Sequence, residues 1–169
     1  FKYTLINMEK NMQQKEKIYI RNRYKIETIL DSGGFGITYL AEDPEFCQNV
    51  VLKKYCPLED RKISYEKGKK DFLRAARTLS ALSDITAIVR VLDYFEERGD
   101  AYIVMEYVKG HSLRKYIENR IESMNFSQAW DFFLLIIDAL EKMYEKNLIH
   151  RDINPDNIIV REDEILKLI

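Results

Sequence analysis

Three glycines within four residues, in the segment "DSGGFGITYL", constrain the fold of this chain more than any other feature. The residues on either side, "YKIETIL" and "ITYLAE", alternate apolar and polar side chains, which is typical of half-buried strands. Two strands joined by a glycine-rich turn predict a β-hairpin. A dinucleotide-binding fingerprint needs a helix directly after the glycines, so that helix amides meet the pyrophosphate. The pattern therefore excludes that fold and leaves two interpretations, a tight turn or a loop that closes over phosphates.

The strand pattern continues through the first half of the chain and is interrupted once by helical spacing. We expect a third strand in "NVVLKKY" and a strand, turn and strand in "IVRVLDYFEE", "RGD" and "AYIVMEYV". Between them, "YEKGKKDFLRAARTLSAL" has helical spacing, with one apolar face formed by Phe72, Ala76, Leu79 and Leu82. The polar segment up to Lys17 is expected to be a loose arm or short helix. These elements predict a five-stranded antiparallel sheet with one helix, an α+β fold.

The second half of the chain is predicted to be helical. A short amphipathic helix is expected in "SLRKYIENRI" and a long one in "SQAWDFFLLIIDALEKMYEKN", with Ser127 as its N-cap. Apolar residues of the long helix recur at helical spacing, namely Phe133, Ile137, Leu140 and Tyr144. With Leu134, Leu135 and Ile136 beside them, we predict that this helix is largely buried. A final hairpin is expected from "NIIV" to "ILKLI".

Composition narrows the possible partners. The chain is 46% hydrophobic and 33% charged, as is usual for a globular protein, and 27 basic against 28 acidic residues give a net charge of −1. This balance argues against a nucleic-acid partner and leaves proteins or small molecules. The longest apolar run, "FFLLII", is too short for a membrane span. Cys47 and Cys56 match no zinc or redox motif, so we expect reduced thiols in a cytoplasmic protein.

Two motifs suggest phosphoryl-transfer chemistry. Lys53, 17 residues after Gly36, can reach the α- and β-phosphates of a nucleotide under the hairpin; the alternative is an edge-strand lysine in solvent, which we expect Lys54 to be. Much later, "HRDINPDN" sets Asp152 and Asn157 five residues apart. In phosphoryl transfer, such an aspartate orients the attacking hydroxyl while the asparagine oxygen faces a metal ion on the phosphates. The combined pattern makes a purely structural role for these residues a weak alternative.

Together, "GGFGITYLA", "KKYCP" and "HRDINPDN" resemble segments of the eukaryotic-like Ser/Thr protein kinase domains of bacteria. The similarity covers the first half of such a domain, from Tyr24 to Ile169. It implies a protein-kinase-like fold, ATP and Mg²⁺ as cofactors, and a protein substrate, with Pro155 favouring Ser or Thr over Tyr. The parts that it implies are an N-terminal arm over 1–23, an N-lobe over 24–104, a hinge over 105–110 and a partial C-lobe over 111–169.

The resemblance also implies a role for individual residues. The nucleotide-binding residues would be Gly33, Gly34, Phe35, Gly36, Val51, Lys53, Met105, Glu106, Val108 and Ile159. Val51 and Ile159 would enclose the adenine, and the backbone of Glu106 and Val108 would hydrogen-bond it beside the gatekeeper Met105. The catalytic residues would be Asp152, Lys53 and Asn157, with Asn157 as a metal ligand.

Three residues depart from the family pattern. Asp31 stands where the first loop glycine is usual, and Asn154 stands where many relatives have a lysine. Ala75 occupies the position of the helix glutamate that pairs with the strand lysine, and Asp71 is the only near substitute. Leaving a buried charge without its partner costs about 3 to 5 kcal/mol, or roughly two to four powers of ten in rate. The alternative hypothesis is therefore a pseudokinase, a nucleotide-binding or scaffolding module.

The family continues after "ILKLI" with Asp-Phe-Gly, whose aspartate holds the principal Mg²⁺. From the resemblance we expect the chain as given to be a truncated and inactive portion of a kinase domain. A third hypothesis is an unstable fragment, in which part of the "FFLLII" helix is exposed.

Overall fold

The computed structural model describes residues 17–34, 36–57, 62–119 and 125–169. The chain forms two compact units. Unit 1 contains the residues up to Thr78 together with Val91–Tyr107, and unit 2 contains Leu79–Arg90 together with Val108–Ile169.

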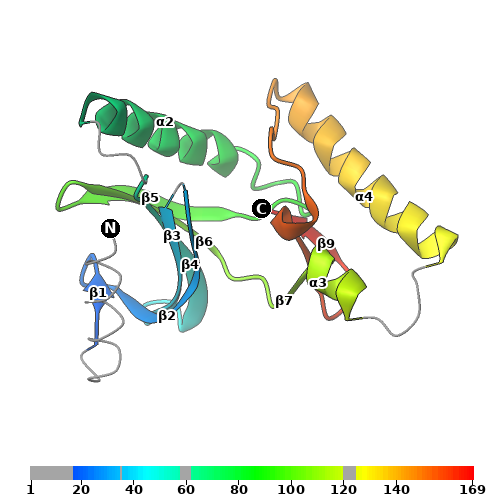
Figure 1. Ribbon diagram of the computed structural model, residues 1–169, viewed down its shortest axis with the longest axis horizontal. Coiled ribbons are helices and arrows are strands. Elements are labelled where there is room, and N and C mark those ends of the chain that lie inside the picture. The colour runs from blue at the N-terminus through cyan, green and yellow to red at the C-terminus, as the bar shows by residue number, and fades with distance from the viewer. Residues whose placement is uncertain (1–16, 35, 58–61, 120–124) are drawn as a thin grey trace. The chain divides into compact units, whose positions relative to one another are not determined.

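Unit 1 is built on a six-stranded antiparallel sheet with the strand order β1-β2-β3-β4-β6-β5 (Figure 1). Its strands are β1 (Tyr19–Ile20), β2 (Tyr24–Gly33), β3 (Gly36–Asp43), β4 (Gln48–Tyr55), β5 (Val91–Glu97) and β6 (Asp100–Glu106). Alternate side chains from these strands form one apolar core, with Tyr39, Val50, Leu52 and Val104 fully buried. The predicted glycine-rich hairpin is the pair of β2 and β3, which confirms that part of the prediction.

The sheet has one strand more than the five predicted from the sequence. Tyr19 and Ile20 pair with the start of β2, and Ile20 joins the core. The sequence pattern missed this strand because two residues are too few to display alternation. Its turn, at Arg21 and Asn22, has positive φ angles of 54° and 51° without any glycine, so the usual turn signal was also absent.

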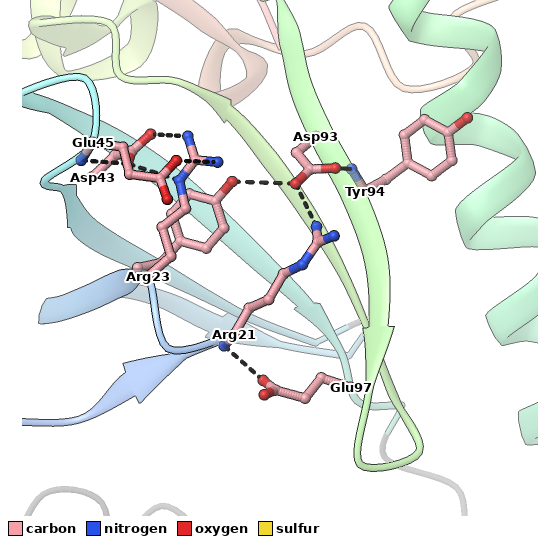
Figure 2. Close-up of polar contacts among 8 residues, drawn as sticks. Arg21, Arg23, Asp43, Glu45, Asp93, Tyr94 and Glu97 are labelled. Atoms are coloured by element: carbon pink, nitrogen blue, oxygen red, sulfur yellow. Dashed lines mark hydrogen bonds and ion pairs between the residues drawn. The ribbon is translucent and has the colours of Figure 1, made fainter.

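Two arginines fasten this first turn to the rest of the sheet (Figure 2). The Arg21 guanidinium lies 2.7 Å from the Asp93 carboxylate, and the Arg21 backbone N–H donates to Glu97 at 2.8 Å. Arg23 donates two hydrogen bonds, of 2.9 and 2.7 Å, to the buried carboxylate of Asp43. These bonds hold the pKa of Asp43 below its usual range, because they favour the ionised form. The turn is therefore held by charge pairs that reach both β3 and β5.

Among the described residues of unit 1, the helix is α2 (Lys62–Ser80), where helical spacing was predicted. Its residues are mostly good helix formers, and Arg77 in the last turn faces the negative end of the helix dipole. Ala76, from the predicted apolar face, is completely buried. The helix contacts the sheet near the β5–β6 turn, through Lys69, and at the end of β4, through Tyr55.

Unit 2 combines a small antiparallel sheet with helices. Its elements are β7 (Gly110–Ser112), α3 (Leu113–Glu118), α4 (Phe126–Glu145), the short 3-10 helix η1 (Pro155–Asn157), β8 (Ile158–Arg161) and β9 (Leu166–Leu168). The strands pair in the order β7-β8-β9, so the predicted final hairpin is present with one further strand beside it. The buried core consists of Leu82, Ile85, Ile88, Ala139, Met143, Ile158, Val160, Leu166 and Leu168.

Helix α4 differs from its prediction in two respects. Its N-cap is Asn125 rather than Ser127: the Asn125 side chain accepts from the Gln128 N–H at 2.9 Å, and the Gln128 side chain accepts from the Asn125 N–H at 3.4 Å. This capping box satisfies two terminal amides, whereas Ser127 lies inside the helix.

The prediction that α4 is largely buried was wrong for the described residues. Only Ala139 and Met143 of α4 are buried, while Phe133, Ile137 and Tyr144 are exposed. The apolar spacing predicted the helix, but spacing cannot reveal how much surface the neighbouring elements cover. Within the part of the chain that the structure describes, no helix has both the length and the hydropathy of a membrane span.

Candidate active site

The glycine-rich hairpin closes at Gly33 and Gly36, whose Cα atoms are partners at the ends of β2 and β3. Gly34 lies in the turn between them, and Phe35 lies outside the described residues. A Cβ atom on Gly36 would lie 2.0 Å from the carbonyl oxygen of Lys54, so only glycine fits where the hairpin meets β4. A Cβ on Gly33 would meet nothing within 4 Å. Gly36 is thus required by packing, whereas Gly33 leaves open space beside the hairpin.

The two neighbouring lysines of β4 have different environments. β4 lies between β3 and β6, so it is not an edge strand. Lys53 is half-buried, pairs in register with Thr38 and Ile103, and has no carboxylate partner among the described residues. Lys54 has a side chain only 14% exposed, and its Nζ lies 2.6 Å from the Asp100 carboxylate. The prediction that Lys54 is a solvent-exposed edge lysine was therefore wrong, while Lys53 carries the charge that remains available for a ligand.

The predicted adenine-contacting residues are divided between the two units. Val51 of β4 pairs in register with Met105 of β6, and Glu106 is the last residue of β6. Val51 and Lys53 are two positions apart and therefore point to the same face of the sheet. Val108 and Ile159 belong to unit 2, where Ile159 is half-buried in β8. The structure thus brings Val51, Met105 and Glu106 together within unit 1.

The loop before η1 holds the Asp152 carboxylate between two carboxamides. Asn154 donates from Nδ2 to Asp152 Oδ1 at 3.0 Å, and Asn157 donates from Nδ2 to Asp152 Oδ2 at 2.7 Å. Asn154 also caps η1, because its Oδ1 accepts from the N–H groups of Asp156 and Asn157 at 2.9 and 3.2 Å. In the sequence, Asn154 stood out only as a departure from the family pattern. Its signal was the preference of asparagine for bonding the backbone two residues ahead.

Asn157 presents an oxygen as well as a donor. Its Nδ2 donates two hydrogen bonds, to the Asp152 carboxylate and to the Asp152 carbonyl oxygen at 3.0 Å. Its Oδ1 is left without a donor among the described residues, and this amide orientation follows from the bonding network. Carboxamide and carboxylate oxygens are hard ligands that suit Mg²⁺. No group of three or more His, Cys, Asp or Glu that could hold a metal ion gathers in the described ranges.

His150 supports the loop. Its Nε2 lies 2.8 Å from the carbonyl oxygen of Ile169, and its Nδ1 lies 3.4 Å from the N–H of Asp152. Because a carbonyl oxygen can only accept, Nε2 carries the proton and Nδ1 accepts, which is the neutral tautomer. Beyond it, Arg114 of α3 contacts both carboxylate oxygens of Asp156 at 2.9 Å. His150 therefore positions the backbone of Asp152, a role that the sequence analysis did not assign.

Comparison with known proteins identifies the family. The family model of the protein kinase domain matches residues 24–169. The chain belongs to the protein kinase domain family. This kinase domain is 34% identical over 143 residues to serine/threonine-protein kinase PknA of Nostoc sp., covering 83% of the chain and 25% of the relative. It is 33% identical over 153 residues to serine/threonine-protein kinase B of Synechocystis sp., covering 89% and 26%.

A third relative and a solved structure are also similar to this chain. Serine/threonine-protein kinase PrkC of Bacillus subtilis is 31% identical over 144 residues, covering 83% of this kinase domain and 21% of the relative. The apo form of PpkA-294 superposes with a TM-score of 0.81 at 24% identity, covering 91% of this chain and 60% of that one. This likeness confirms the predicted kinase-like α+β fold. The chain spans about a quarter of the length of the three named relatives.

Proposed function

We propose that this chain forms the nucleotide-binding and catalytic-loop part of a Ser/Thr protein kinase. The proposed reaction transfers the γ-phosphoryl group of ATP to a Ser or Thr hydroxyl of a protein. The observation that carries the proposal is the arrangement of Asp152 and Asn157, which are hydrogen-bonded at 2.7 Å on one capped loop. The names of the relatives, serine/threonine-protein kinases, support the choice of substrate class.

Each residue has a distinct task in this proposal. Asp152 accepts a hydrogen bond from the attacking hydroxyl and directs it to the phosphorus, while Asn154 and Asn157 keep the carboxylate in one orientation. Lys53 binds the α- and β-phosphates, and the backbone of the Gly33–Gly36 hairpin covers them. Mg²⁺, when bound, would neutralise charge on the phosphates, with Asn157 Oδ1 as one protein ligand.

The proposal is tested with three variants. In Lys53→Met, Mg-ATP affinity should fall about tenfold to a hundredfold, because a charge-assisted contact to phosphate is lost. In Asp152→Asn, Mg-ATP affinity should change little, while phosphoryl transfer falls about a hundredfold to ten-thousandfold. Lys70→Met is the matched control, since it removes an exposed lysine of the same unit.

Binding is measured on this chain by titration calorimetry. Transfer is measured with labelled ATP and a Ser/Thr-containing protein, using a protein in which the chain is followed by Asp-Phe-Gly and the rest of a kinase domain. Equal ATP affinity in Lys53→Met and Lys70→Met would contradict the nucleotide site. Undiminished transfer in Asp152→Asn would contradict the proposed chemistry.

A second candidate is a pseudokinase that binds nucleotide without efficient transfer. It is supported by Lys53, which lacks a carboxylate partner among the described residues, and by Ala75, which is an exposed alanine on α2. The same experiment separates the two candidates. Mg-ATP binding that depends on Lys53, together with transfer no faster than in Asp152→Asn, would favour the pseudokinase.

A further inference from the structure

Helix α2 is tied to the sheet by a lysine on its inner side. Lys69 is only 6% exposed, and its Nζ lies 2.9 Å from a carboxylate oxygen of Glu96 in β5. It also lies 3.2 Å from Glu66, one helical turn earlier, and donates to the carbonyl oxygen of Gly99 at 3.4 Å. Glu96 and Glu66 raise the pKa of Lys69, so it remains charged at neutral pH. Because Glu66 is on the same helix, Lys69 connects α2 to the β5–β6 hairpin through Glu96 and Gly99.

The helix rests on an aromatic residue at the end of β4. The ring of Tyr55 lies 5.5 Å from the ring of Tyr65 and 5.4 Å from that of Phe72, both on α2. A Cβ on Gly68 would lie 1.9 Å from the Tyr55 hydroxyl oxygen. Glycine in a helix interior costs about 1 kcal/mol relative to alanine. A larger residue at position 68 would collide with Tyr55, which explains why glycine occupies this helix position despite its cost in stability.

A third connection passes through Asp100. Its carboxylate lies 2.6 Å from Lys54 Nζ and accepts from the Tyr65 hydroxyl at 3.3 Å. Burial, together with the nearby Asp100 charge, raises the pKa of Tyr65 to about 12, so the hydroxyl keeps its proton and can donate. Asp100 thereby joins α2 to the end of strand β4.

Two of these connections end in β4 beside the proposed phosphate-binding lysine, and the Lys69 connection ends in the neighbouring β5–β6 hairpin. Lys54 and Tyr55 directly follow Lys53, and Tyr55 is the register partner of Gly36 in the glycine-rich hairpin. The carbonyl oxygen of Lys54 is the atom that a Cβ on Gly36 would strike. Lys54 and Tyr55, which take part in two of the α2 connections, therefore also border the hairpin and directly follow Lys53. Position 75 of α2 contributes no carboxylate to this arrangement, because the residue there is an alanine, which is exposed.

We propose that Lys69 is a positioning residue: paired with Glu96, it holds α2 against Tyr55 and so fixes the end of β4 that carries Lys53. In this chain the Lys69–Glu96 pair takes the place of a direct contact between the helix and Lys53. The inference rests on the proposed function, because it takes Lys53 as the ligand of the nucleotide phosphates. Breaking the Lys69–Glu96 pair lowers nucleotide affinity although Lys53 itself is unchanged.

The test is a double-mutant cycle of Lys69→Met and Glu96→Gln in the 169-residue chain. Mg-ATP affinity is measured by calorimetry, and amide hydrogen exchange is followed in α2 and β4. Each single variant should lower ATP affinity about threefold to tenfold, within the range of couplings between residues in contact, and the double variant should lose no more than either single one. Exchange in α2 should become faster in the same three proteins.

Two further variants separate positioning from a general loss of stability. Lys69→Arg keeps the charge and reach to Glu96, so it should retain most of the ATP affinity, while Lys70→Met should behave as the wild type. Glu96 is half exposed, with 48% of its side chain accessible, so Glu96→Gln keeps the test possible if Lys69→Met fails to fold.

The outcomes distinguish this inference from the function on which it rests. Lys53→Met is measured in parallel: if it leaves ATP affinity unchanged, the nucleotide site itself is wrong. If Lys53→Met weakens binding but Lys69→Met and Glu96→Gln do not, the site stands and the positioning role is overturned. Additive losses in the double variant would also overturn it, because they would mean that Lys69 and Glu96 act independently.

Discussion

Unit 1 and the loop of unit 2 that we propose to be catalytic, residues 152–157, hold their charged groups in different ways. In unit 1 two of the charge pairs join residues far apart in sequence: Arg23 and Asp43 are 20 positions apart, and Arg21 and Asp93 are 72 apart. In the catalytic loop, Asp152 is held by Asn154, two positions away, and by Asn157, five positions away. The loop therefore carries its geometry within one short motif, whereas these two pairs of unit 1 form only when distant segments of the sheet have come together.

The difference extends to the two groups that the proposed function needs most. The Asp152 carboxylate already has two neutral donors, so its orientation is set before a hydroxyl arrives. Lys53 is half-buried and meets no carboxylate in the described parts of the chain. Preorganised groups need little rearrangement during a reaction. The position of a lysine ammonium without a partner, in contrast, is set only by the strand that carries it. The catalytic loop should thus tolerate changes elsewhere in the fold better than the phosphate-binding side does.

The largest effect is expected from breaking a long-range pair in unit 1. Asp43→Asn leaves Arg23 without its buried carboxylate, although Arg23 keeps Glu45 at 2.9 Å and stays partly exposed. We expect the free energy of unfolding of the sheet to fall by about 2 kcal/mol at pH 7, less than for a fully buried pair. The measurement is the slowest amide exchange in β2, β3 and β4.

The pH dependence of the free energy of unfolding shows whether loss of charge pairing causes the destabilisation in Asp43→Asn. The pKa of Asp43 is lowered in the folded state, so its stabilising contribution is complete above the unfolded value, about 4, and is lost as pH falls through the folded value. The gap between wild type and Asp43→Asn should therefore narrow below pH 4. A gap that stays constant down to pH 2 would mean that the asparagine disturbs packing rather than charge pairing.

The same contrast explains what the sequence could predict. The hairpin, α2, the long helix and the spacing of Asp152 and Asn157 were evident because periodicity and short motifs are local. The pairing of Lys54 with Asp100, the tie of Lys69 to Glu96 and the strand at Tyr19–Ile20 were missed. These features depend on which strands become neighbours, and two residues or one charge carry no periodic signal. The exposure of α4 was mispredicted for the related reason that spacing does not count the neighbours available to cover a face.

The second prediction gives Lys53 a long-range partner of its own. Ala75→Glu adds a carboxylate at an exposed position of α2, so no unpaired charge is forced into the core. In a complete kinase domain that contains this chain, phosphoryl transfer should rise about tenfold, a modest part of what an ion pair can contribute. Transfer is measured with labelled ATP at saturating Mg²⁺.

Its control is the same change in a Lys53→Met background. There the new glutamate has no ammonium to meet, so the gain should disappear and the two changes should be strongly non-additive. An equal gain in both backgrounds would indicate a general effect of the added charge. No gain in either one would mean that α2 does not present position 75 to Lys53.

The smallest effect is expected from the local network of the catalytic loop. Asn154→Ala removes the cap of η1 and one of the two donors to Asp152, but the bond from Asn157 remains. Loss of a cap costs about 1 kcal/mol, so amide exchange at Asp156 and Asn157 should accelerate about fivefold, while exchange in β2 to β4 stays unchanged.

Asp156→Asn is the matched control, because it removes the exposed pair with Arg114 and keeps the cap, and such surface pairs contribute little. Faster exchange in Asp156→Asn than in Asn154→Ala would mean that α3, and not the asparagine network, holds the loop. Exchange that also accelerates throughout β2 to β4 would contradict the local character of the loop.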